Sequence, residues 1–297
     1  MNGQKPSWPT VTLVVLLLGG SLVAGSGALD ETWDPIAQLI GLGHPPVPAS
    51  ANVLSEHETE QLVAMSPQDQ ACLLLERAIN HYHGAGEQIA VRVDSWRGHL
   101  TLDQRLDGLF RLGINSDDLT VRVAALEVDI AARNLRKDVA TVDRLEAAAR
   151  TGAQGPRVNA MWDLALVGNR GVAPERVFDI LRSNLHDPNE NIRYWAVEGL
   201  AYLGTDAGLQ PLLEVFRDDP LPMIRERAAC SLAQSGMFSA EQRRRVVPQL
   251  IDLAGDGALD ETTRGWVYQA LRDITGASLP HDPESWRAGF GRAGGQR

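Results

Sequence analysis

Cysteine and lysine are both scarce in this chain. The two cysteines, Cys72 and Cys230, are too few for a disulfide-rich scaffold or a multi-cysteine metal site. Each lies in an Ala-rich or Leu-rich segment, as a small core residue does. The two lysines, Lys5 and Lys137, follow no glycine-rich loop, so the sequence offers no lysine of a phosphate-binding loop.

Basic side chains are in the minority as well. The 297 residues carry 28 Lys and Arg against 38 Asp and Glu, a formal net charge of −10. This charge argues against a general nucleic-acid binder, which needs a basic surface for the phosphates. Aromatic residues make up only 5%, but hydrophobic residues reach 44%. This composition excludes disorder throughout, a collagen-like fibre and a polytopic membrane protein, and the length fits two domains or one elongated array.

One long apolar run stands at the amino end. Lys5 precedes it, residues 11–29 carry no charge, and Asp30 follows. This charge order is that of an export signal, with the amino end in the cytoplasm and the rest of the chain outside. The small residues Ser26–Ala28 suit a signal peptidase, whereas an uncleaved run of this length nearly spans a bilayer. We therefore expect residues 1–29 to be a signal peptide or a membrane anchor, with cleavage left open.

The next segment is rich in helix breakers. Residues 30–58 begin with a short amphipathic pattern and continue with closely spaced glycines and prolines, which predicts a flexible tether. Beyond it we expect a helical array over residues 59–276. Residues 277–297 are expected to form a C-terminal capping helix and tail, with Trp286 and Phe290 one helical turn apart.

The informative feature is an internal repeat. From about residue 60 the apolar residues recur at helical spacing, with almost no alternating strand pattern. Five segments carry an arginine, and in the three clearest copies alanine, leucine and glycine follow it three, seven and eleven residues later. The arginines are Arg122, Arg157, Arg193, Arg225 and Arg264, at intervals of 35, 36, 32 and 39 residues. A period of this length is typical of stacked helical hairpins.

The repeated positions have a packing logic. The alanines let two helices approach closely, the leucines lie one turn further along the same face, and Gly168, Gly204 and Gly236 suit a left-handed helix end. Asp187 and Asp219 stand where a carboxylate accepts from the free amides of a helix start. The first copy departs from the pattern, because Asp129 stands where leucine is expected, and it is not a clear full repeat.

With these residues the chain resembles HEAT repeats, in particular the short type found in the phycobiliprotein-lyase-like group. The resemblance covers about residues 100–276, and the signatures of tetratricopeptide and ankyrin repeats are missing. It implies an all-α fold, a right-handed α-solenoid of helical hairpins. In the family the arginine and the turn aspartate link neighbouring units, which implies this structural role for Arg193 with Asp187 and for Arg225 with Asp219.

Catalytic motifs are weak. Residues 289–294 match the dinucleotide fingerprint by letters, but no βαβ unit surrounds them. His81 and His83 are two residues apart, which points them in different directions on a helix. Some HEAT-type hydroxylases bind iron through several His-Glu pairs, whereas His57-Glu58 is the only such pair here. Bilin lyases of the same repeat group act on cytoplasmic proteins, which conflicts with an export signal. We therefore expect no enzyme, no cofactor and no metal ligands.

What remains is a surface. In HEAT arrays the arginine-bearing helices line the concave side, and the positions two, five and nine after each arginine should face away from the alanines and leucines. The candidate partner-binding residues at these positions are Asn159, Trp162, Trp195, Glu198, Tyr202, Arg227, Trp266 and Gln269. Aromatic and arginine side chains are good interface anchors. The alternative, tryptophans that fill gaps between repeats, stays open.

These expectations combine into one functional hypothesis. We expect a non-enzymatic scaffold of the cell envelope, periplasmic or tethered to the inner membrane, that binds a protein or peptide on its concave face. No nucleic acid is expected as a partner, and membrane contact is expected only through the N-terminal segment. The alternative is an envelope enzyme or small-ligand carrier, lyase-like or metal-dependent, that uses the same groove.

Overall fold

The computed structural model describes residues 53–116 and 118–290. It divides the chain into Met1–Asn52 and a compact unit, Val53–Arg297. The expectations for residues 1–29 and for most of the tether lie outside the described residues. Residues 53–58 belong to the compact unit, because Leu54 is buried and its backbone N–H donates to the carbonyl of His83 at 3.0 Å. None of the helices in the described part is long and apolar enough to cross a membrane.

The described chain is a succession of short helices. The first group comprises α3 (Glu56–Leu62), α4 (Pro67–Ile79), α5 (Ala85–Trp96), α6 (Gln104–Ile114) and α7 (Leu119–Ala132). The second comprises α8 (Val139–Ala149), α9 (Gln154–Asn169), α10 (Pro174–Ser183), α11 (Glu190–Leu203), η1 (Asp206–Gly208), α12 (Leu209–Asp218), α13 (Pro222–Cys230), η2 (Ser231–Ser235), α14 (Ala240–Arg245), α15 (Val247–Ala254), α16 (Glu261–Thr275) and α17 (Pro283–Phe290). Over the residues that the structure describes, extended pairing is limited to one β-bridge between Val53 and His83.

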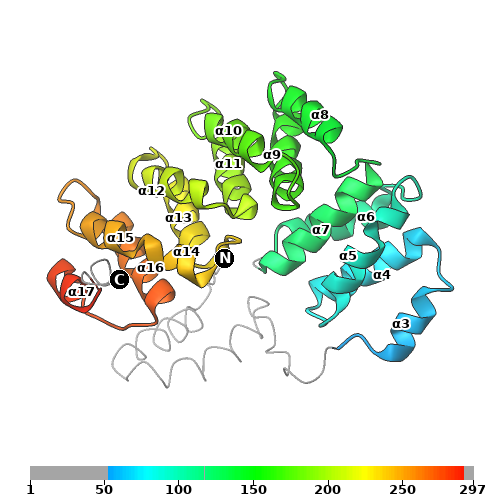
Figure 1. Cartoon of the computed structure of the whole chain (residues 1–297), viewed down its shortest axis with the longest axis horizontal. Helices are drawn as coiled ribbons and strands as arrows, with labels where there is room; N and C mark the ends of the chain where they lie inside the picture. The colour runs from blue at the N-terminus through cyan, green and yellow to red at the C-terminus, as the bar shows by residue number, and fades with distance from the viewer. Residues whose placement is uncertain (1–52, 117, 291–297) are drawn as a thin grey trace, which may run out of the picture. The chain divides into compact units, whose positions relative to one another are not determined.

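The second group stacks as helical hairpins. Figure 1 shows α8, α10, α12 and α15 along the outer edge of this part, and α9, α11, α13 and α16 along its inner edge. Helices α9, α11 and α13 each pack on their own outer helix and on the next inner helix, and α16 packs on α15 and α13. The prediction of an all-α solenoid of helical hairpins is therefore confirmed.

The inner helices run parallel to one another. Arg157 near the start of α9 pairs with Asp187 just before α11, and Asn169 at the end of α9 donates to the carbonyl of Leu203 at the end of α11, at 3.4 Å. Beyond α11, the backbone N–H of Met237 donates to the carbonyl of Ala201 at 2.8 Å. Equivalent positions of successive repeats therefore meet, as a solenoid requires.

The repeated small and apolar residues form the core. Ala160, Ala196 and Ala228 have no exposed surface, nor do Leu200 and Leu232. An alanine at a helix crossing lets the two backbones approach, and the leucine one turn later fills the space between the same two helices. The packing interpretation of these positions therefore matches the structure.

The three repeat glycines have different roles. Gly204 ends α11 with φ +67°, and an added Cβ would lie 2.7 Å from the carbonyl of Met237. Gly168 lies inside α9, where a Cβ would meet Leu203 and Val177, and Gly236 follows the π-helix η2 with φ −82°. The predicted left-handed helix end occurs only at Gly204 among these three, because close packing explains the other two.

The first group does not continue the array in register. Near its middle, α7 contacts the end of α9 through Glu127 and Arg170, whose side chains lie 2.8 Å apart. At its C-terminal end, Arg133 bonds Asp163 in the middle of α9. Helix α7 therefore runs antiparallel to α9, unlike the other inner helices, and the copy around Arg122 is not a repeat in phase with the rest.

Two hydrophobic cores result from this arrangement. One is formed by α3 to α7, and the other extends from α6 to α17. Helix α7 contributes to both, with Ala125 and Val128 in the first and Leu126 and Ile130 in the second. At the far end, α17 packs on α15 with Trp286 fully buried and stacked on Phe290 at 5.7 Å between ring centroids.

Candidate partner-binding groove

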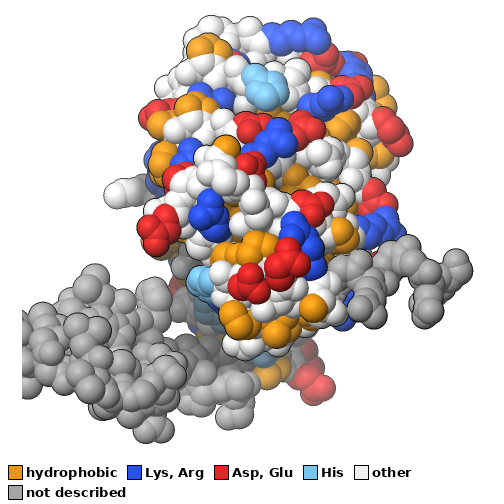
Figure 2. All heavy atoms as spheres, turned by 90° about the vertical axis from the view of Figure 1, so that its left-hand side faces the viewer, with side chains coloured by type: hydrophobic (Ala, Val, Ile, Leu, Met, Phe, Trp, Pro, Cys, Tyr) orange, Lys and Arg blue, Asp and Glu red, His pale blue; other side chains and the backbone are white. Residues whose placement is uncertain are grey.

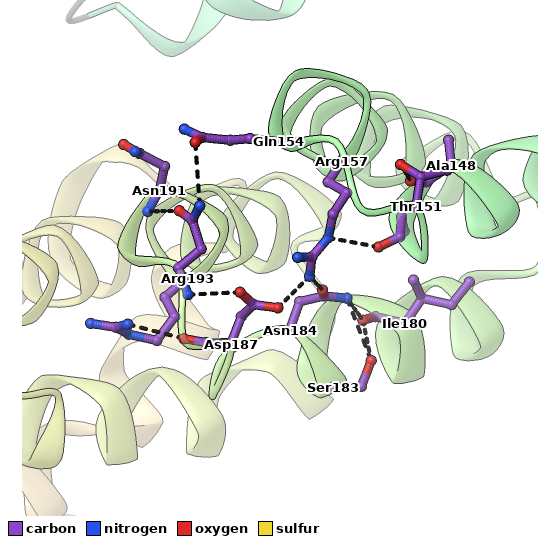
Figure 3. Close-up of polar contacts among 12 residues, drawn as sticks. Ala148, Thr151, Gln154, Arg157, Ile180, Ser183, Asn184, Asp187, Asn191 and Arg193 are labelled. Carbon is purple, nitrogen blue, oxygen red and sulfur yellow. Dashed lines mark hydrogen bonds and ion pairs between the residues drawn. The ribbon is translucent and has the colours of Figure 1, made fainter.

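A ladder of arginines and aspartates joins the turns of successive repeats. Arg157 pairs with Asp187 of the next repeat, as Figure 3 shows. Arg193 donates to both carboxylate oxygens of Asp219, at 2.9 and 3.3 Å. Arg225 donates to Asp260 at 3.0 Å. Each arginine thus reaches forward to the aspartate of the following repeat.

This pairing differs from the one that the resemblance implied. Arg193 contacts Asp187 only through the backbone carbonyl, at 3.0 Å, and Arg225 contacts the carbonyl of Asp219 at 2.8 Å. The reason is geometric: the carboxylate of Asp187 caps its own turn by accepting from the N–H of Asn189 at 2.8 Å. It therefore faces the preceding repeat, where the arginine of that repeat can reach it.

The surroundings of Asp187 favour the ionised form of its carboxyl group. Burial on its own would raise the pKa of the Asp187 carboxyl, but the hydrogen bonds from Arg157 and from the N–H of Asn189 hold that pKa below its usual value. Charge-assisted hydrogen bonds of this kind are the strong ones. The ladder fixes the rotation of one repeat on the next and so shapes the inner surface of the array.

The outermost arginines are not part of the ladder. Arg264 donates to the carbonyls of Asp256 and Leu259, both at 3.0 Å. Arg122 is buried, and its guanidinium lies over the ring of Tyr202 in α11, 5.6 Å from the ring centroid. Because α7 is reversed relative to α9, Arg122 packs across the inner face onto α11.

A groove opens on this inner side, between the α6–α7 turn and helices α11 and α13. Its volume is about 500 Å³. The lining residues are Ile114, Asn115, Ser116, Arg122, Asn191, Tyr194, Trp195, Glu198, Met223, Glu226, Arg227 and Cys230. We call this feature the inner groove.

Aromatic side chains form one wall of the inner groove. Trp195 lies edge-on to Tyr194 at 5.1 Å and to Trp162 at 4.4 Å between ring centroids. Trp162 lies behind this wall and is only 8% exposed, with Phe110 of α6 at 6.0 Å. Trp195 is half-buried, so one part of its ring is fixed by packing while the rest faces the groove. Such a ring is pre-organised for contact with a ligand.

An ion pair lies on the floor of the inner groove. Glu198 of α11, only 2% exposed, accepts from Nε of Arg227 in α13. Met223 and Glu226, on the same face of α13, are exposed at the rim. The inner groove therefore presents apolar, acidic and basic groups close together without a large excess of one sign. Figure 2 shows the same mixing of acidic and basic side chains on the face at the C-terminal end of the molecule.

The structure separates the predicted site residues into three groups. Trp195, Glu198 and Arg227 come together in the inner groove. Trp162 and Tyr202 are buried, and burial raises the pKa of the Tyr202 hydroxyl well above its usual value. The remaining candidates lie on the surface outside the inner groove: Asn159 and Gln269 are exposed and Trp266 is half-buried.

The burial of Trp162 and Tyr202 has one cause. The repeat phase places these side chains on the inner face of the array, but α6 and α7 cover that part of the face with Phe110 and Arg122. The same spacing rule missed Tyr194, Met223 and Glu226, which line the inner groove at other repeat positions. The sequence signal available for Met223 was a methionine next to a proline at an expected helix start, since methionine is common at adaptable binding surfaces.

The remaining titratable groups are carboxylates, histidines and two thiols. No group of three or more His, Cys, Asp and Glu side chains is arranged to hold a metal ion within residues 53–116 and 118–290. Burial raises the pKa of the thiols of Cys72 and Cys230. A thiol of raised pKa is a poor nucleophile.

With this geometry in place, comparison with known proteins assigns the array. Residues 142–233 match the family described as HEAT repeats. The chain contains HEAT repeats. They generally serve in protein interaction, and the family is typically non-enzymatic. The matched HEAT repeats extend from α8 to η2 and include the ladder residues Arg157, Arg193 and Arg225.

Similarity to other known proteins is weak. No curated protein matches the sequence. Among solved structures, the crystal structure of an engineered protein matches with 15% sequence identity and a TM-score of 0.37, over 75% of this chain and 94% of that one.

Proposed function

We propose that this HEAT-repeat protein is a scaffold that binds a protein or peptide partner in the inner groove. The observation that carries the proposal is the half-exposed ring of Trp195, held by Tyr194 and Trp162 at the edge of a groove of about 500 Å³. Interface anchors are typically aromatic rings that are already ordered before the partner arrives. Met223 at the opposite rim adds an exposed and adaptable apolar contact.

The test compares two tryptophans. Trp195→Ala removes the aromatic wall, whereas Trp266→Ala removes another half-buried tryptophan outside the inner groove. Partners are captured with the purified full chain from solubilised membranes, and their affinity for both variants is then measured. Trp195→Ala should weaken binding by about 2 kcal/mol or more, the scale of an interface anchor. Equal retention by both variants would remove the inner groove as the binding site.

Folding has to be monitored in the same experiment. Trp195 also packs on Trp162, so its removal is expected to lower the melting temperature to some extent. Circular dichroism of both variants at the temperature of the binding assay should give the helical content of the wild type. Binding lost together with helical content would assign Trp195 to packing and contradict its role as an anchor.

We further propose that the partner belongs to the cell envelope. The apolar run of residues 11–29, with Lys5 before it and Asp30 after it, has the charge order of an export signal. A reporter enzyme that is active only after export, fused behind Arg297, should be active. The mass of the mature chain then distinguishes a cleaved signal from a retained anchor, and activity of a cytoplasmic reporter alone would contradict export.

A small-ligand carrier is the second candidate. It is favoured by another cavity, of about 600 Å³, lined by small residues of α5 and α7 and edged by His81, Asp118 and Arg170. This volume lies within the usual range of small-molecule sites. Native mass spectrometry after mild purification should show a stoichiometric bound molecule if this candidate is correct.

A further inference from the structure

The inner face of this array already binds one helix, which is α7 of the same chain. Leu126 and Ile130, one turn apart on α7, are buried in the core that contains α9 and α11. Charged side chains secure the two flanks. Arg170 of α9 pairs with Glu127 at 2.8 Å, and Arg133 reaches Asp163 at 2.8 Å. The recognition pattern is an apolar stripe flanked by charges, which is the pattern of an amphipathic helix in a groove.

The inner groove continues this helix-binding face. It begins at the α6–α7 turn, where Ser116 and Arg122 line its near end, and it extends over the neighbouring inner helices α11 and α13. Beyond the N-terminal end of α7, the same face offers Trp195 and Met223 as apolar contacts with Glu226 beside them. Its volume of about 500 Å³ accommodates a few large side chains of a docked helix rather than the helix itself.

The charges favour one kind of helix. The charged residues that line the inner groove are Arg122, Glu198, Glu226 and Arg227. Glu198 and Arg227 form an ion pair on the floor and the guanidinium of Arg122 is buried over the Tyr202 ring, whereas Glu226 is exposed at the rim. The whole chain carries a net charge of −10, which attracts basic partners at long range. A basic side chain on the docked helix has both Glu226 and the faces of Tyr194 and Trp195 within the groove to contact.

We infer that the partner of the inner groove is a basic amphipathic α-helix, docked on α11 and α13 in continuation of α7. Apolar side chains one turn apart contact Trp195 and Met223, and a lysine or arginine beside them faces Glu226. The inference rests on the proposed function, because it names the class of partner for the same groove. It differs from that function in requiring a helix rather than an extended peptide.

Two displayed peptide libraries of equal length test this inference with the full chain as the target. One library encodes helix-forming peptides with variable residues on one face, and the other encodes linear peptides rich in glycine and proline. Helical peptides with apolar residues at i and i+4 and a neighbouring Lys or Arg should be enriched. Their far-ultraviolet circular dichroism should show a gain of helix on binding.

Charge reversal supplies the decisive measurement. Glu226→Arg should weaken binding of the selected helices at least about tenfold, whereas Asp179→Arg, on the exposed side of outer helix α10, should leave it within about twofold. A selected peptide whose basic residue is changed to glutamate should regain affinity for the Glu226→Arg variant. This rescue cannot arise from a fold that is merely damaged.

The other outcomes overturn the inference in distinguishable ways. Linear peptides that need Trp195 would overturn the helix and keep the proposed function. Helical peptides that bind the Glu226→Arg variant as well as the wild type would remove the basic contact and overturn the inference. If neither library yields a binder that depends on Trp195, the inference and the proposed function fail together.

Discussion

At the scale of single residues, the most consequential group is the carboxyl of Asp163. It has no exposed surface, and its guanidinium partner Arg133 is shared with the buried Asp129. Two carboxylates against one guanidinium leave one negative charge uncompensated in the interior. Burial therefore raises the pKa of Asp163 to about 6, against the opposing effect of Arg133.

The raised pKa predicts a pH-dependent stability with a defined sign. Between the unfolded value of 3.8 and the folded value of about 6, the native state holds a proton that the unfolded state has lost. The free energy of unfolding therefore falls as the pH rises from about 5 to 7, by roughly 1 kcal/mol from this group. Urea unfolding of the wild type and of Asp163→Asn at both pH values measures this change in the free energy of unfolding, because the variant lacks the carboxyl group that titrates.

The control for this measurement is Asp179→Asn, which removes an exposed carboxyl on α10. Asp187, whose pKa is held low, contributes only at lower pH. If the stability difference between wild type and Asp163→Asn is the same at both pH values, Asp163 is ionised throughout.

At the scale of helices and turns, the ladder makes each junction depend on one ion pair. The Arg193–Asp219 pair is nearly buried on both sides and bidentate, and the Asp219 carboxylate also accepts from the N–H of Leu221 at 2.9 Å. Asp219→Ala leaves the nearly buried guanidinium of Arg193 with the backbone carbonyl of Asp187, at 3.0 Å, in place of a carboxylate.

We expect Asp219→Ala to lower the free energy of unfolding by about 3 kcal/mol or more, as for other broken buried pairs. Chemical denaturation measures this change. Asp218→Ala, one residue earlier, serves as the control because the Arg217–Asp218 pair is exposed and worth less than about 1 kcal/mol. Equal losses for the two variants would mean that the ladder pair contributes no more than a surface contact.

The period of these elements could be read from the sequence, but the direction of α7 could not. Alanine, leucine and glycine recur because every repeat packs on its neighbour through the same positions, so local sequence records that contact. Arg122 looks like the other repeat arginines because its surroundings in the sequence are similar. The reversal of α7 depends on distant partners such as Arg170 and Phe110, which no local pattern contains.

The candidate site could also be predicted only in part. The phase of the repeat places Trp195 and Arg227 on the inner side, and both line the inner groove. Trp162 and Tyr202 follow the same rule and are nevertheless buried, because the reversed hairpin α6–α7 covers them. The sequence pattern did not identify Asp260 as a ladder residue, because Asp260 stands four residues before the arginine of its own repeat, Arg264. Asp187 and Asp219 stand six residues before the arginines of their own repeats.

At the scale of the whole compact unit, two hydrophobic cores meet at α7. The first is formed by α3 to α7 and contains Leu75, and the second extends from α6 to α17 and contains Leu200. In repeat arrays the free energy of unfolding is approximately a sum over the single repeats and over the interfaces between neighbouring repeats. A destabilising substitution therefore need not affect all helices equally. The joint between α7 and α9 combines the buried side chains of Leu126 and Ile130 with a few charged pairs, among them Arg170 with Glu127.

Two matched leucine variants test whether the cores unfold separately. Leu75 and Leu200 are both fully buried, so truncation of either to alanine should cost about 2 to 5 kcal/mol. Native-state hydrogen exchange should show that Leu200→Ala accelerates exchange in α9, α11 and α13 and leaves α4 and α5 protected, while Leu75→Ala does the reverse. The reason is that the buried side chains of α4 and α5 belong to the first core, whereas those of α11 and α13 belong to the second. Equal acceleration across all helices in both variants would mean that α7 couples the cores into one cooperative unit.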